Sequence, residues 1–406
     1  MADRFPGGVI SKTPPEVVAP VDGEGGSASG VWTLDEVLGY EKAGSWPRLT
    51  LPRELYAWGA NSNGQVGDGT TTASSSPVQI GALTNWAHVA AATVSVAVKT
   101  DGTMWSWGAN SQGQLGDGTT YARSSPVQIG ALTNWYLVAT NSTLCLAVKT
   151  DGTMWSWGAN SQGQLGLGDA INTSSPSQIG ALTSWAKVAA GPYNGTAIKT
   201  DGTLWSWGAG ARGAVGDLTN YVYRSSPVQI GALSNWYTVS RGERHALATK
   251  TDGTLWAWGS AVSGQLGDNT RLGGDKSSPV QIGALTNWST AGLMAGSSNT
   301  SVAVKTDGTL WLWGYNGSGQ IGDNTTNNRS SPVQVGALTS WQQASAGASV
   351  TLAVKTDGTL WSWGVGTGSL GQNSAVSKSS PVQIGSLTNW FSVSGGGGHS
   401  IAITRG

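Results

Sequence analysis

Several residue types that often mark a chemical site are scarce in this chain of 406 residues. It has one cysteine, three histidines and two phenylalanines, and only 11% of its residues are charged. Cys145 has no second cysteine for a disulfide bond, and its apolar neighbours at 144–148 indicate a small buried side chain. The 22 basic and 22 acidic residues balance, so no basic stripe predicts a nucleic acid partner.

Signals for export, membrane insertion, metals and cofactors are also missing. Residues 1–20 show no charged segment followed by an apolar one, so we expect no signal peptide. No run of about 18 apolar residues predicts a membrane span. His88, His245 and His399 fall in different repeats without ligand spacing, so we expect no metal site and no cofactor. The oxygen-rich loop at 323–328 leaves a calcium ion open as an alternative, although it lacks EF-hand spacing.

Glycine (61 residues) and tryptophan (22 residues) are abundant, and they follow a repeat. A Trp-x-Trp-Gly pattern, with tyrosine as its first aromatic residue in the first copy, places its second tryptophan at positions 58, 107, 157, 207, 258, 313 and 363. A spacing close to 50 residues is typical of small units that bury their apolar faces only against one another. The sequence therefore predicts one ring of small units rather than several ordinary domains.

Each repeat reads as four short strands, which the second copy places at residues 86–90, 96–100, 103–108 and 126–129. Asp101 and Gly102 suit a two-residue hairpin, because such turns need positive φ at both central positions. Pro126 at the start of the fourth strand is typical of an outer edge. We therefore predict an all-β fold, a seven-bladed β-propeller of four-stranded antiparallel blades.

The two ends of the repeat region complement each other. The first repeat begins with its third strand near residue 55, and the last ends after its second strand near residue 404. One blade should therefore combine two N-terminal and two C-terminal strands, which closes the ring without exposed sheet edges.

The propeller is predicted for residues 55–406, preceded by an extended Pro/Gly-rich arm at 1–54. A short helix is expected near 33–43, where Thr33 and Glu36 form a capping box. Such a short helix is not stable alone in water, so we expect it to dock on the propeller or on another chain. The candidate anchoring residues are Phe5, Trp32, Leu34, Val37, Leu38 and Trp46.

The repeat resembles the regulator-of-chromosome-condensation family over residues 55–406. The family pattern Gly-x-Asn-x-x-Gly-Gln-Leu-Gly is present at 108–116 and 158–166, and its Gly-x-x-His pattern at 242–245. The resemblance implies a seven-bladed propeller. It also suggests, by similarity to the eukaryotic founder, nucleotide exchange on a small GTPase and nucleosome binding. The wedge that carries the exchange activity has no counterpart here, since the longest spacing, between Trp258 and Trp313, is 55 residues.

The N-terminal arm carries a second resemblance. Residues 1–15, 25–34 and 44–47 look like the leader of structural proteins from marine tailed bacteriophages. This resemblance implies that the arm binds other virion proteins, that many copies assemble, and that the chain is located in the virion.

The copies of the repeat differ mainly in two of their four connections, those between the first and second strands and between the third and fourth. In an antiparallel blade both emerge on the same side of the disc, and loops on a rigid scaffold are where binding usually occurs. Tyrosine and arginine are enriched at interface hot spots. We therefore predict partner contacts, most densely at 190–245, by Tyr121, Arg123, Tyr193, Tyr221, Tyr223, Arg224, Arg241, Arg244, Arg271 and Arg329.

These features favour a non-enzymatic virion structural protein, a fibre, decoration or adhesin module. Its arm would dock on a neighbouring virion subunit, and its loops would bind a host-surface glycan or protein. The alternative is a cellular protein-binding regulator, an exchange-factor-like or inhibitor-like propeller. A third class, an enzyme acting on polysaccharide, needs a pair of acidic residues that the sequence does not reveal. We expect no membrane insertion.

Overall fold

The computed structural model describes residues 52–289, 294–295 and 299–405, and Arg53–Arg405 form one compact unit. Except for residues 52–54, the predicted arm, its helix at 33–43 and the anchoring residues Phe5, Trp32, Leu34, Val37, Leu38 and Trp46 lie outside the described residues. Those expectations stay predictions. No helix in the described part of the chain is long and apolar enough to cross a membrane.

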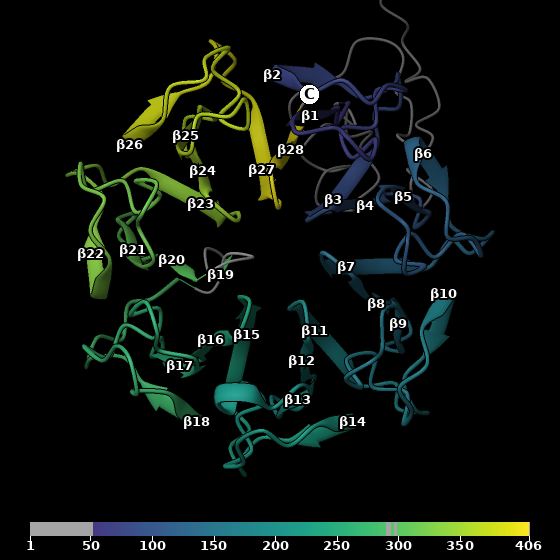
Figure 1. Ribbon diagram of the computed structural model, residues 1–406, viewed down its shortest axis with the longest axis vertical. Helices are drawn as coiled ribbons and strands as arrows, with labels where there is room; N and C mark the ends of the chain where they lie inside the picture. The colour runs from purple at the N-terminus through teal and green to yellow at the C-terminus, as the bar shows by residue number, and fades with distance from the viewer. Residues whose placement is uncertain (1–51, 290–293, 296–298, 406) are drawn as a thin grey trace, which may run out of the picture. The chain divides into compact units, whose positions relative to one another are not determined.

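The described residues form seven four-stranded sheets arranged around a central axis, as the blades of a propeller (Figure 1). We number the blades from the N terminus. Blade 1 contains β27, β28, β1 and β2, and blades 2 to 7 contain β3–β6, β7–β10, β11–β14, β15–β18, β19–β22 and β23–β26. The predicted fold class, an all-β seven-bladed propeller, is confirmed.

The strands occupy equivalent positions in every blade. The innermost are β3 (Trp86–Ala91), β7 (Trp135–Asn141), β11 (Trp185–Ala190), β15 (Trp236–Arg241), β19 (Met294–Ala295), β23 (Trp341–Ala346) and β27 (Trp390–Gly395). The second strands are β4 (Val94–Lys99), β8 (Leu144–Lys149), β12 (Asn194–Lys199), β16 (His245–Lys250), β20 (Thr300–Val304), β24 (Val350–Lys355) and β28 (His399–Thr404). The third strands are β1 (Leu55–Gly59), β5 (Met104–Gly108), β9 (Met154–Gly158), β13 (Leu204–Gly208), β17 (Leu255–Gly259), β21 (Leu310–Gly314) and β25 (Leu360–Gly364). The outer strands are β2 (Ser74–Gln79), β6 (Arg123–Gln128), β10 (Thr173–Gln178), β14 (Arg224–Gln229), β18 (Lys276–Gln281), β22 (Arg329–Gln334) and β26 (Lys378–Gln383).

Blade 1 closes the ring as the sequence predicts. Strand β1 pairs antiparallel with β28, with Leu55 opposite Ile403 and Gly59 opposite His399, in the sheet order β2-β1-β28-β27. The two central strands of this blade therefore come from opposite ends of the repeat region, and their hydrogen bonds join the first and last repeats.

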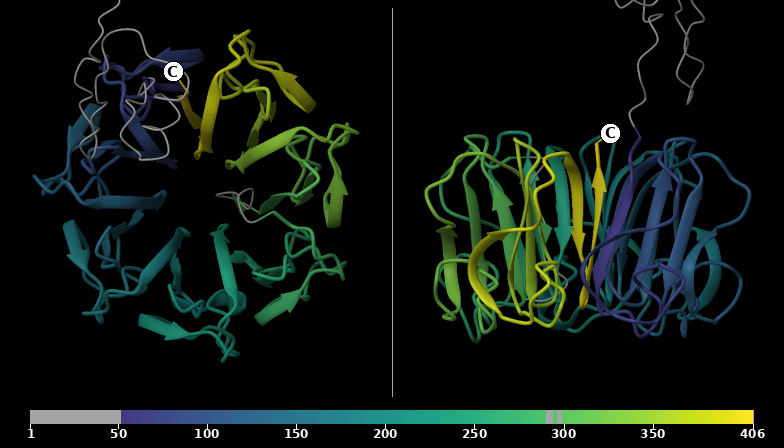
Figure 2. Two further views of the ribbon diagram at one scale, coloured as in Figure 1. Left: turned by 180° about the vertical axis from the view of Figure 1, so that it is seen from behind. Right: turned by 90° about the horizontal axis from the view of Figure 1, so that it is seen from above.

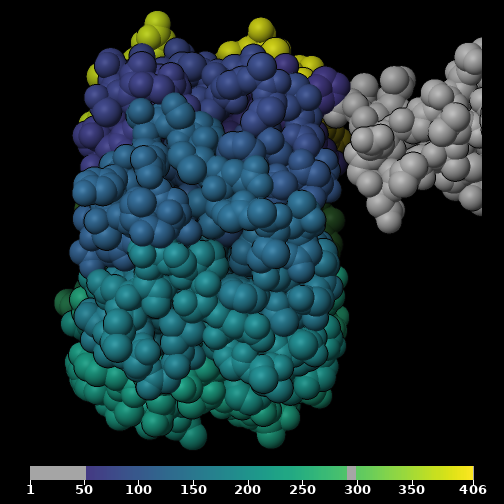
Figure 3. All heavy atoms as spheres, turned by 90° about the vertical axis from the view of Figure 1, so that its right-hand side faces the viewer, coloured from purple at the N-terminus to yellow at the C-terminus, as the bar shows by residue number. Residues whose placement is uncertain are grey.

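Buried tryptophans join neighbouring blades. Trp107 of blade 2 is fully buried, and its Nε1 donates to the Gln65 carbonyl in the loop of blade 1 at 3.0 Å. The Ser95 hydroxyl donates to the same carbonyl at 2.8 Å. Five other tryptophans donate to the equivalent carbonyl of the preceding blade, namely Trp58, Trp157, Trp207, Trp313 and Trp363. Each indole combines a large apolar contact area with a satisfied N–H group. In space-filling form, neighbouring blades meet along the rim (Figure 3).

The outer strand differs from its prediction. Strand β6 begins at Arg123, so Pro126 is its fourth residue rather than its first. The register shifts between Ser106, which faces Val127, and Gly108, which faces Arg123. Proline is tolerated there because the irregularity interrupts the ladder and the strand has no neighbour on its outer side.

The four connections of each blade divide between two faces of the disc (Figure 2). Ala109, after β5, donates its N–H to the Thr93 carbonyl in the β3–β4 turn, so these two connections lie together on what we call the loop face. Trp135 donates to the Gly102 carbonyl, which places the Thr-Asp-Gly turn and the β6–β7 link on the opposite hairpin face. Arg53 and Arg405, which bond to the links at Thr84 and Asn389, also lie on the hairpin face.

Candidate partner-binding face

An asparagine side chain organises the loop between the third and outer strands in four blades. In blade 2, Asn110 Oδ1 accepts from the Leu115 N–H at 2.9 Å, and its Nδ2 donates to the Tyr121 carbonyl at 3.0 Å. Asn61, Asn160 and Asn316 accept the same hydrogen bond in their own loops. Blades 4, 5 and 7 have Gly210, Ala261 and Gly366 at this position, so their loops must be held by other contacts.

The β13–β14 loop of blade 4 takes a different path. It contains a one-turn 3₁₀ helix, η1 (Ala211–Gly213), and the Tyr221 N–H donates to the Gly210 carbonyl at 2.9 Å. Arg212 donates from Nη1 to Asp275 Oδ2 of blade 5 at 3.1 Å. These contacts fix the loop against the neighbouring blade, so its outward-facing side chains are held on an ordered backbone.

Three consecutive large apolar or aromatic side chains of this loop, at 221–223, together with Leu218, define what we call the 218–223 cluster. Leu218, Tyr221 and Tyr223 are 77%, 69% and 61% exposed, and Val222 is also exposed. Leu272, in the loop of blade 5, is exposed as well. Exposed apolar patches on a soluble protein are a mark of interaction sites, and sequence reasoning based on tyrosine and arginine missed both leucines.

The backbone at Leu218 is in the left-handed region, with φ of +69°. The equivalent position holds Gly69, Gly118, Gly168, Asn269, Asn324 and Asn373 in the other blades, all with positive φ. Leucine in this conformation costs roughly 1–2 kcal/mol because its Cβ crowds the backbone. Because the side chain is exposed, it buries no apolar surface that would offset this cost. The leucine therefore indicates a role other than stabilising the fold.

Three predicted contact residues, Arg123, Arg224 and Arg329, occupy the first position of an outer strand and form ion pairs within their own blade. Their partners are Asp117, Asp217 and Asp323, at 2.8, 2.7 and 2.6 Å. Burial raises the pKa of Asp117, but hydrogen bonds from Thr119 and Arg123 outweigh it and leave this pKa below its usual value. These arginines hold the loops, and their side chains stay 38%, 34% and 37% exposed.

The remaining predicted residues fall in separate places. Tyr193 and Arg244 come together from neighbouring turns, with the guanidinium 5.8 Å from the ring centroid, and Arg244 also lies 3.7 Å from Glu243. Arg271 donates to the Asn328 carbonyl. Tyr121 is exposed in blade 2, two blades before the 218–223 cluster.

The prediction that Arg241 lies in a surface loop is wrong. It is the last residue of β15, its side chain is buried, and only 3% of the residue is exposed. Its Nη1 donates to the Ala214 carbonyl of blade 4 at 2.7 Å. The strand continues one residue further than the sequence suggests, which turns this side chain inward.

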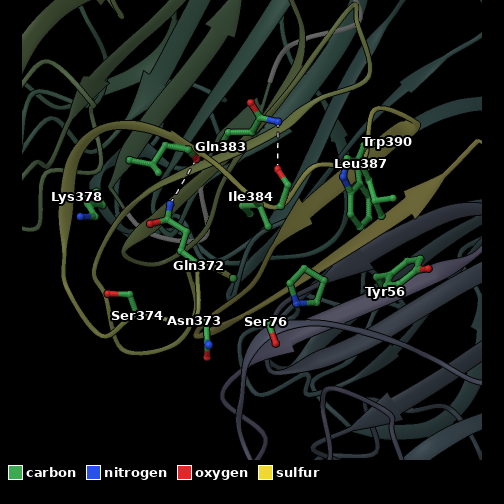
Figure 4. A pocket seen from close by; sticks show the side chains of 14 residues that line it. Tyr56, Ser76, Gln372, Asn373, Ser374, Lys378, Gln383, Ile384, Leu387 and Trp390 are labelled. Carbon is green, nitrogen blue, oxygen red and sulfur yellow. Dashed lines mark hydrogen bonds between the residues drawn. The ribbon is translucent and has the colours of Figure 1, made fainter.

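A groove of about 610 Å³ lies on the rim between blades 7 and 1 (Figure 4). The corresponding groove between blades 2 and 3 is smaller, about 430 Å³. In the larger groove Gln372 stands at the position of Asp117 and donates to Ser362 Oγ at 2.8 Å. Lys378, at the position of Arg123, therefore has no carboxylate from its own loop.

Two of the three histidines, and the cysteine, make hydrogen bonds that support the fold. His245 and His399 bond through Nε2 to Ser301 and Ser95 of the next blade, at 2.9 and 2.8 Å. Burial lowers the pKa of His245 to about 3 and that of His399 to about 4. Cys145 is buried, its thiol donates to the Gln114 carbonyl, and burial raises its pKa to about 12. No group of three or more His, Cys, Asp or Glu residues that could hold a metal occurs within 52–289, 294–295 and 299–405.

Comparison with known proteins supports the repeat assignment. The model of the regulator of chromosome condensation (RCC1) repeat matches residues 54–98, 101–148, 151–198, 201–249, 252–304, 307–354 and 357–403. Human HERC2, an E3 ubiquitin-protein ligase, is 37% identical over 115 residues, which is 27% of this chain and 2% of HERC2. The ultraviolet-B receptor UVR8 of Arabidopsis thaliana is 33% identical over 126 residues, 30% of this chain and 27% of UVR8. The chain thus spans less than a third of either curated relative.

Solved structures share the fold. Human WBSCR16 superposes with a TM-score of 0.75 at 20% identity, covering 87% of this chain and 99% of that protein. Yeast RCC1 (Prp20), solved bound to Kap60, superposes with a TM-score of 0.77 at 19% identity, covering 87% and 89%. At these identities the likeness shows the architecture, while function depends on the particular side chains of the loops.

Proposed function

The chain belongs to the RCC1 repeat family, and we propose that it is a protein-binding propeller whose partner contacts the loop face at blades 4 and 5. The observation that carries this proposal is Leu218, an exposed leucine at a positive φ where six other blades have glycine or asparagine. Partner binding would compensate the conformational cost of this residue by burying its side chain.

The surroundings of Leu218 suit a protein partner. Tyr221 and Tyr223 supply aromatic rings that lose little conformational entropy on binding, and tyrosine is enriched among the residues that dominate interface affinity. The ion pairs Arg212–Asp275 and Arg224–Asp217 supply a polar surrounding. An apolar centre with a polar rim is the usual anatomy of a protein interface.

The role we propose is binding rather than catalysis. The buried histidines and Cys145 are occupied in the joints between blades, and Glu243 faces Arg244. Arg53 and Arg405 bond to the links of the hairpin face, which is opposite the loop face that we propose as the contact surface.

The test replaces two tyrosines and compares the effect on the two faces. A partner is first identified by photocrosslinking from position 223 of the full-length protein, and its affinity is then measured with purified components. Tyr221→Ala with Tyr223→Ala should weaken binding about 100-fold, since two hot-spot side chains contribute about 3 kcal/mol together. The matched control, Tyr136→Ala with Tyr237→Ala, removes two exposed tyrosines near the hairpin face and should leave affinity unchanged. Equal affinity in all three proteins would sink the proposal.

A role as a virion structural protein is a second candidate function, because residues 1–47 resemble the leader of phage structural proteins. In that case the loop face would contact a host-surface glycan or protein, multivalent display would strengthen weak contacts, and the chain would be located in the virion. Full-length protein with Phe5, Trp32 and Trp46 replaced by alanine should then fail to join purified particles. Recovery of a soluble enzyme or GTPase, without virion subunits, would instead favour a cellular regulator.

A further inference from the structure

The groove on the rim between blades 7 and 1 contains a lysine without an acidic partner. In blades 2, 4, 5 and 6 the cation at the start of the outer strand pairs with a carboxylate of its own loop, as Lys276 does with Asp268 at 3.4 Å. Blade 7 has Gln372 at the position of that carboxylate, and its Nε2 donates inward to Ser362 Oγ at 2.8 Å. Among the described residues Lys378 forms no ion pair and no aspartate or glutamate lines the groove, so one positive charge is uncompensated.

Other polar side chains that line this groove also have free hydrogen-bonding groups. Asn373 Oδ1 accepts from the Ser75 hydroxyl of blade 1 at 2.9 Å, whereas Asn373 Nδ2 and the Ser76 hydroxyl have no hydrogen-bond partner in the described part of the chain. Asn373 and Ser76 are exposed and Lys378 is half-buried, so a ligand can reach all three. These groups suit a ligand that both donates and accepts hydrogen bonds.

The groove has an aromatic end and a cationic end. Figure 4 shows Tyr56 and Lys378 at opposite ends of the lining, with Asn373 between them. The Tyr56 ring is half-buried, and its hydroxyl donates to Glu54 Oε2 at 2.9 Å, which places a carboxylate near the aromatic end. An elongated ligand with an acid group would therefore lie with that group at the Lys378 end, where it is attracted rather than repelled.

The groove suits a sugar chain better than a peptide strand. A peptide strand would pair with the outer strands β26 and β2, which border the groove, through a row of backbone N–H groups. Pro381 and Pro77 interrupt that row, because proline has no N–H. The hydroxyls of a sugar chain donate and accept hydrogen bonds, and its C–H faces can pack on an aromatic ring such as Tyr56. The volume of about 610 Å³ is in the usual range for small-ligand sites.

We propose that the groove between blades 7 and 1 binds an acidic oligosaccharide. Its carboxylate or sulfate group pairs with the Lys378 ammonium, and one of its sugar rings packs on Tyr56. Asn373 Nδ2 and the Ser76 hydroxyl bond to the sugar hydroxyls between these ends. The hydrogen bond from Ser75 holds the Asn373 amide across the two blades, so this donor is positioned before the ligand binds. The site is separate from the loop face of blades 4 and 5 and does not depend on the partner proposed there.

The first experiment probes an array of immobilised oligosaccharides with the labelled full-length protein. The array contains chains with uronate groups, chains with sulfate groups and the neutral counterpart of each chain, so that it distinguishes the two sources of the acid group. We expect at least one acidic chain to bind more strongly than its neutral counterpart. If no acidic chain does so, the proposal is overturned.

Calorimetry with the acidic chain that binds most strongly then tests the groove itself. Lys378→Met and Asn373→Gly should each weaken binding about fivefold, since each removes one polar contact at an accessible site. Asn373→Gly keeps the backbone, because glycine occupies this positive-φ position in blades 1, 2 and 3. The matched controls, Lys276→Met in blade 5 and Asn324→Gly in blade 6, should leave affinity unchanged. Equal affinity in the groove variants and their controls would place the sugar elsewhere on the propeller and overturn the proposal.

Discussion

The hairpin face and the loop face are built from the same repeats, yet the supporting contacts recur from blade to blade on the hairpin face and vary on the loop face. On the hairpin face of blade 3, the Lys149 ammonium lies 3.8 Å from the Trp155 ring centroid and 4.7 Å from that of Trp135. Thr153 accepts from Trp155 Nε1 at 2.9 Å and donates to Asp151 at 2.6 Å. The same arrangement of lysine, aspartate, threonine and two tryptophans recurs in blades 2 to 7.

On the loop face the supporting contacts change from blade to blade. The asparagine that holds the loop in blade 2 is replaced by Gly210 in blade 4, where a 3₁₀ turn and the Arg212–Asp275 pair hold the loop instead. A side chain in the hairpin network contacts several partners at once, so one substitution leaves several of them unsatisfied. A loop held by one asparagine can be rebuilt after a single change. The difference explains why variety accumulates on one side of the disc.

The largest expected effect comes from adding one methyl group on the hairpin face. Gly102 and Gly118 have similar φ, +75° and +78°, but a Cβ at Gly102 would lie 2.0 Å from the Thr133 carbonyl oxygen, whereas at Gly118 the nearest atom is at 3.8 Å. Gly102→Ala should lower the free energy of unfolding by about 4 kcal/mol, and Gly118→Ala by about 1 kcal/mol. Denaturant unfolding measures both, and equal losses would show that the two faces tolerate change alike.

The next effect separates the joints between blades. Trp157 Nε1 donates to the Gln114 carbonyl at 3.0 Å, whereas Trp258 Nε1 has no partner among the described residues. Trp157→Phe should cost about 3 kcal/mol and Trp258→Phe about 2 kcal/mol, because only the first loses a hydrogen bond as well as packing. A larger loss of stability in Trp258→Phe than in Trp157→Phe would contradict the interpretation that Trp258 Nε1 makes no hydrogen bond between blades 4 and 5.

A smaller effect, with the opposite sign, is expected at Leu218. Leu218→Asn introduces the residue that blades 5, 6 and 7 use at this positive φ, and should raise the free energy of unfolding by about 1 kcal/mol. The control is Asn324→Leu, which should lower it by a similar amount. A stabilised Leu218→Asn protein that binds its partner less tightly would show that the leucine serves the interface.

The sequence was enough for the fold, because its signals are local. The Asp101-Gly102 turn and the tryptophan spacing identify the blade, and the split repeat at residues 55 and 404 identifies the closing blade. The start of the outer strand was predicted at Pro126 instead of Arg123, because a bulge in an edge strand has no local sequence signal. The prediction for residues 1–54 is untested by the described residues.

The candidate site was predicted less well, because its side chains depend on distant contacts. Arg241 turns inward to a carbonyl 27 residues earlier in the chain, which no local pattern reveals. Arg123, Arg224 and Arg329 were selected for their chemistry, while their ion pairs emerge only from the loop path. Leu218 could have been found by aligning the repeats with one another, since it replaces glycine or asparagine at a turn position.

The smallest effect concerns the dependence of stability on pH at the hairpin face. The Thr309 hydroxyl and N–H donate to Asp307 and hold its pKa below the usual value, as Thr153 and Thr254 do for Asp151 and Asp252. Above the unfolded pKa of about 3.9 these carboxylates stabilise the fold, and the contribution is lost as the pH falls through the folded pKa.

Replacing all three aspartates by asparagine keeps an acceptor for each threonine but removes the charge. Because the carboxylates are exposed and screened, each replacement should cost only a few tenths of a kcal/mol at pH 7, and the effects of the three distant turns should add. The difference between variant and wild type should shrink as the pH falls below the unfolded pKa of about 3.9 and disappear once the aspartates are protonated in both states. Urea unfolding at pH 7 and at several acid pH values measures it. A difference that persists at low pH would mean that turn geometry, rather than charge, accounts for the aspartate of this face.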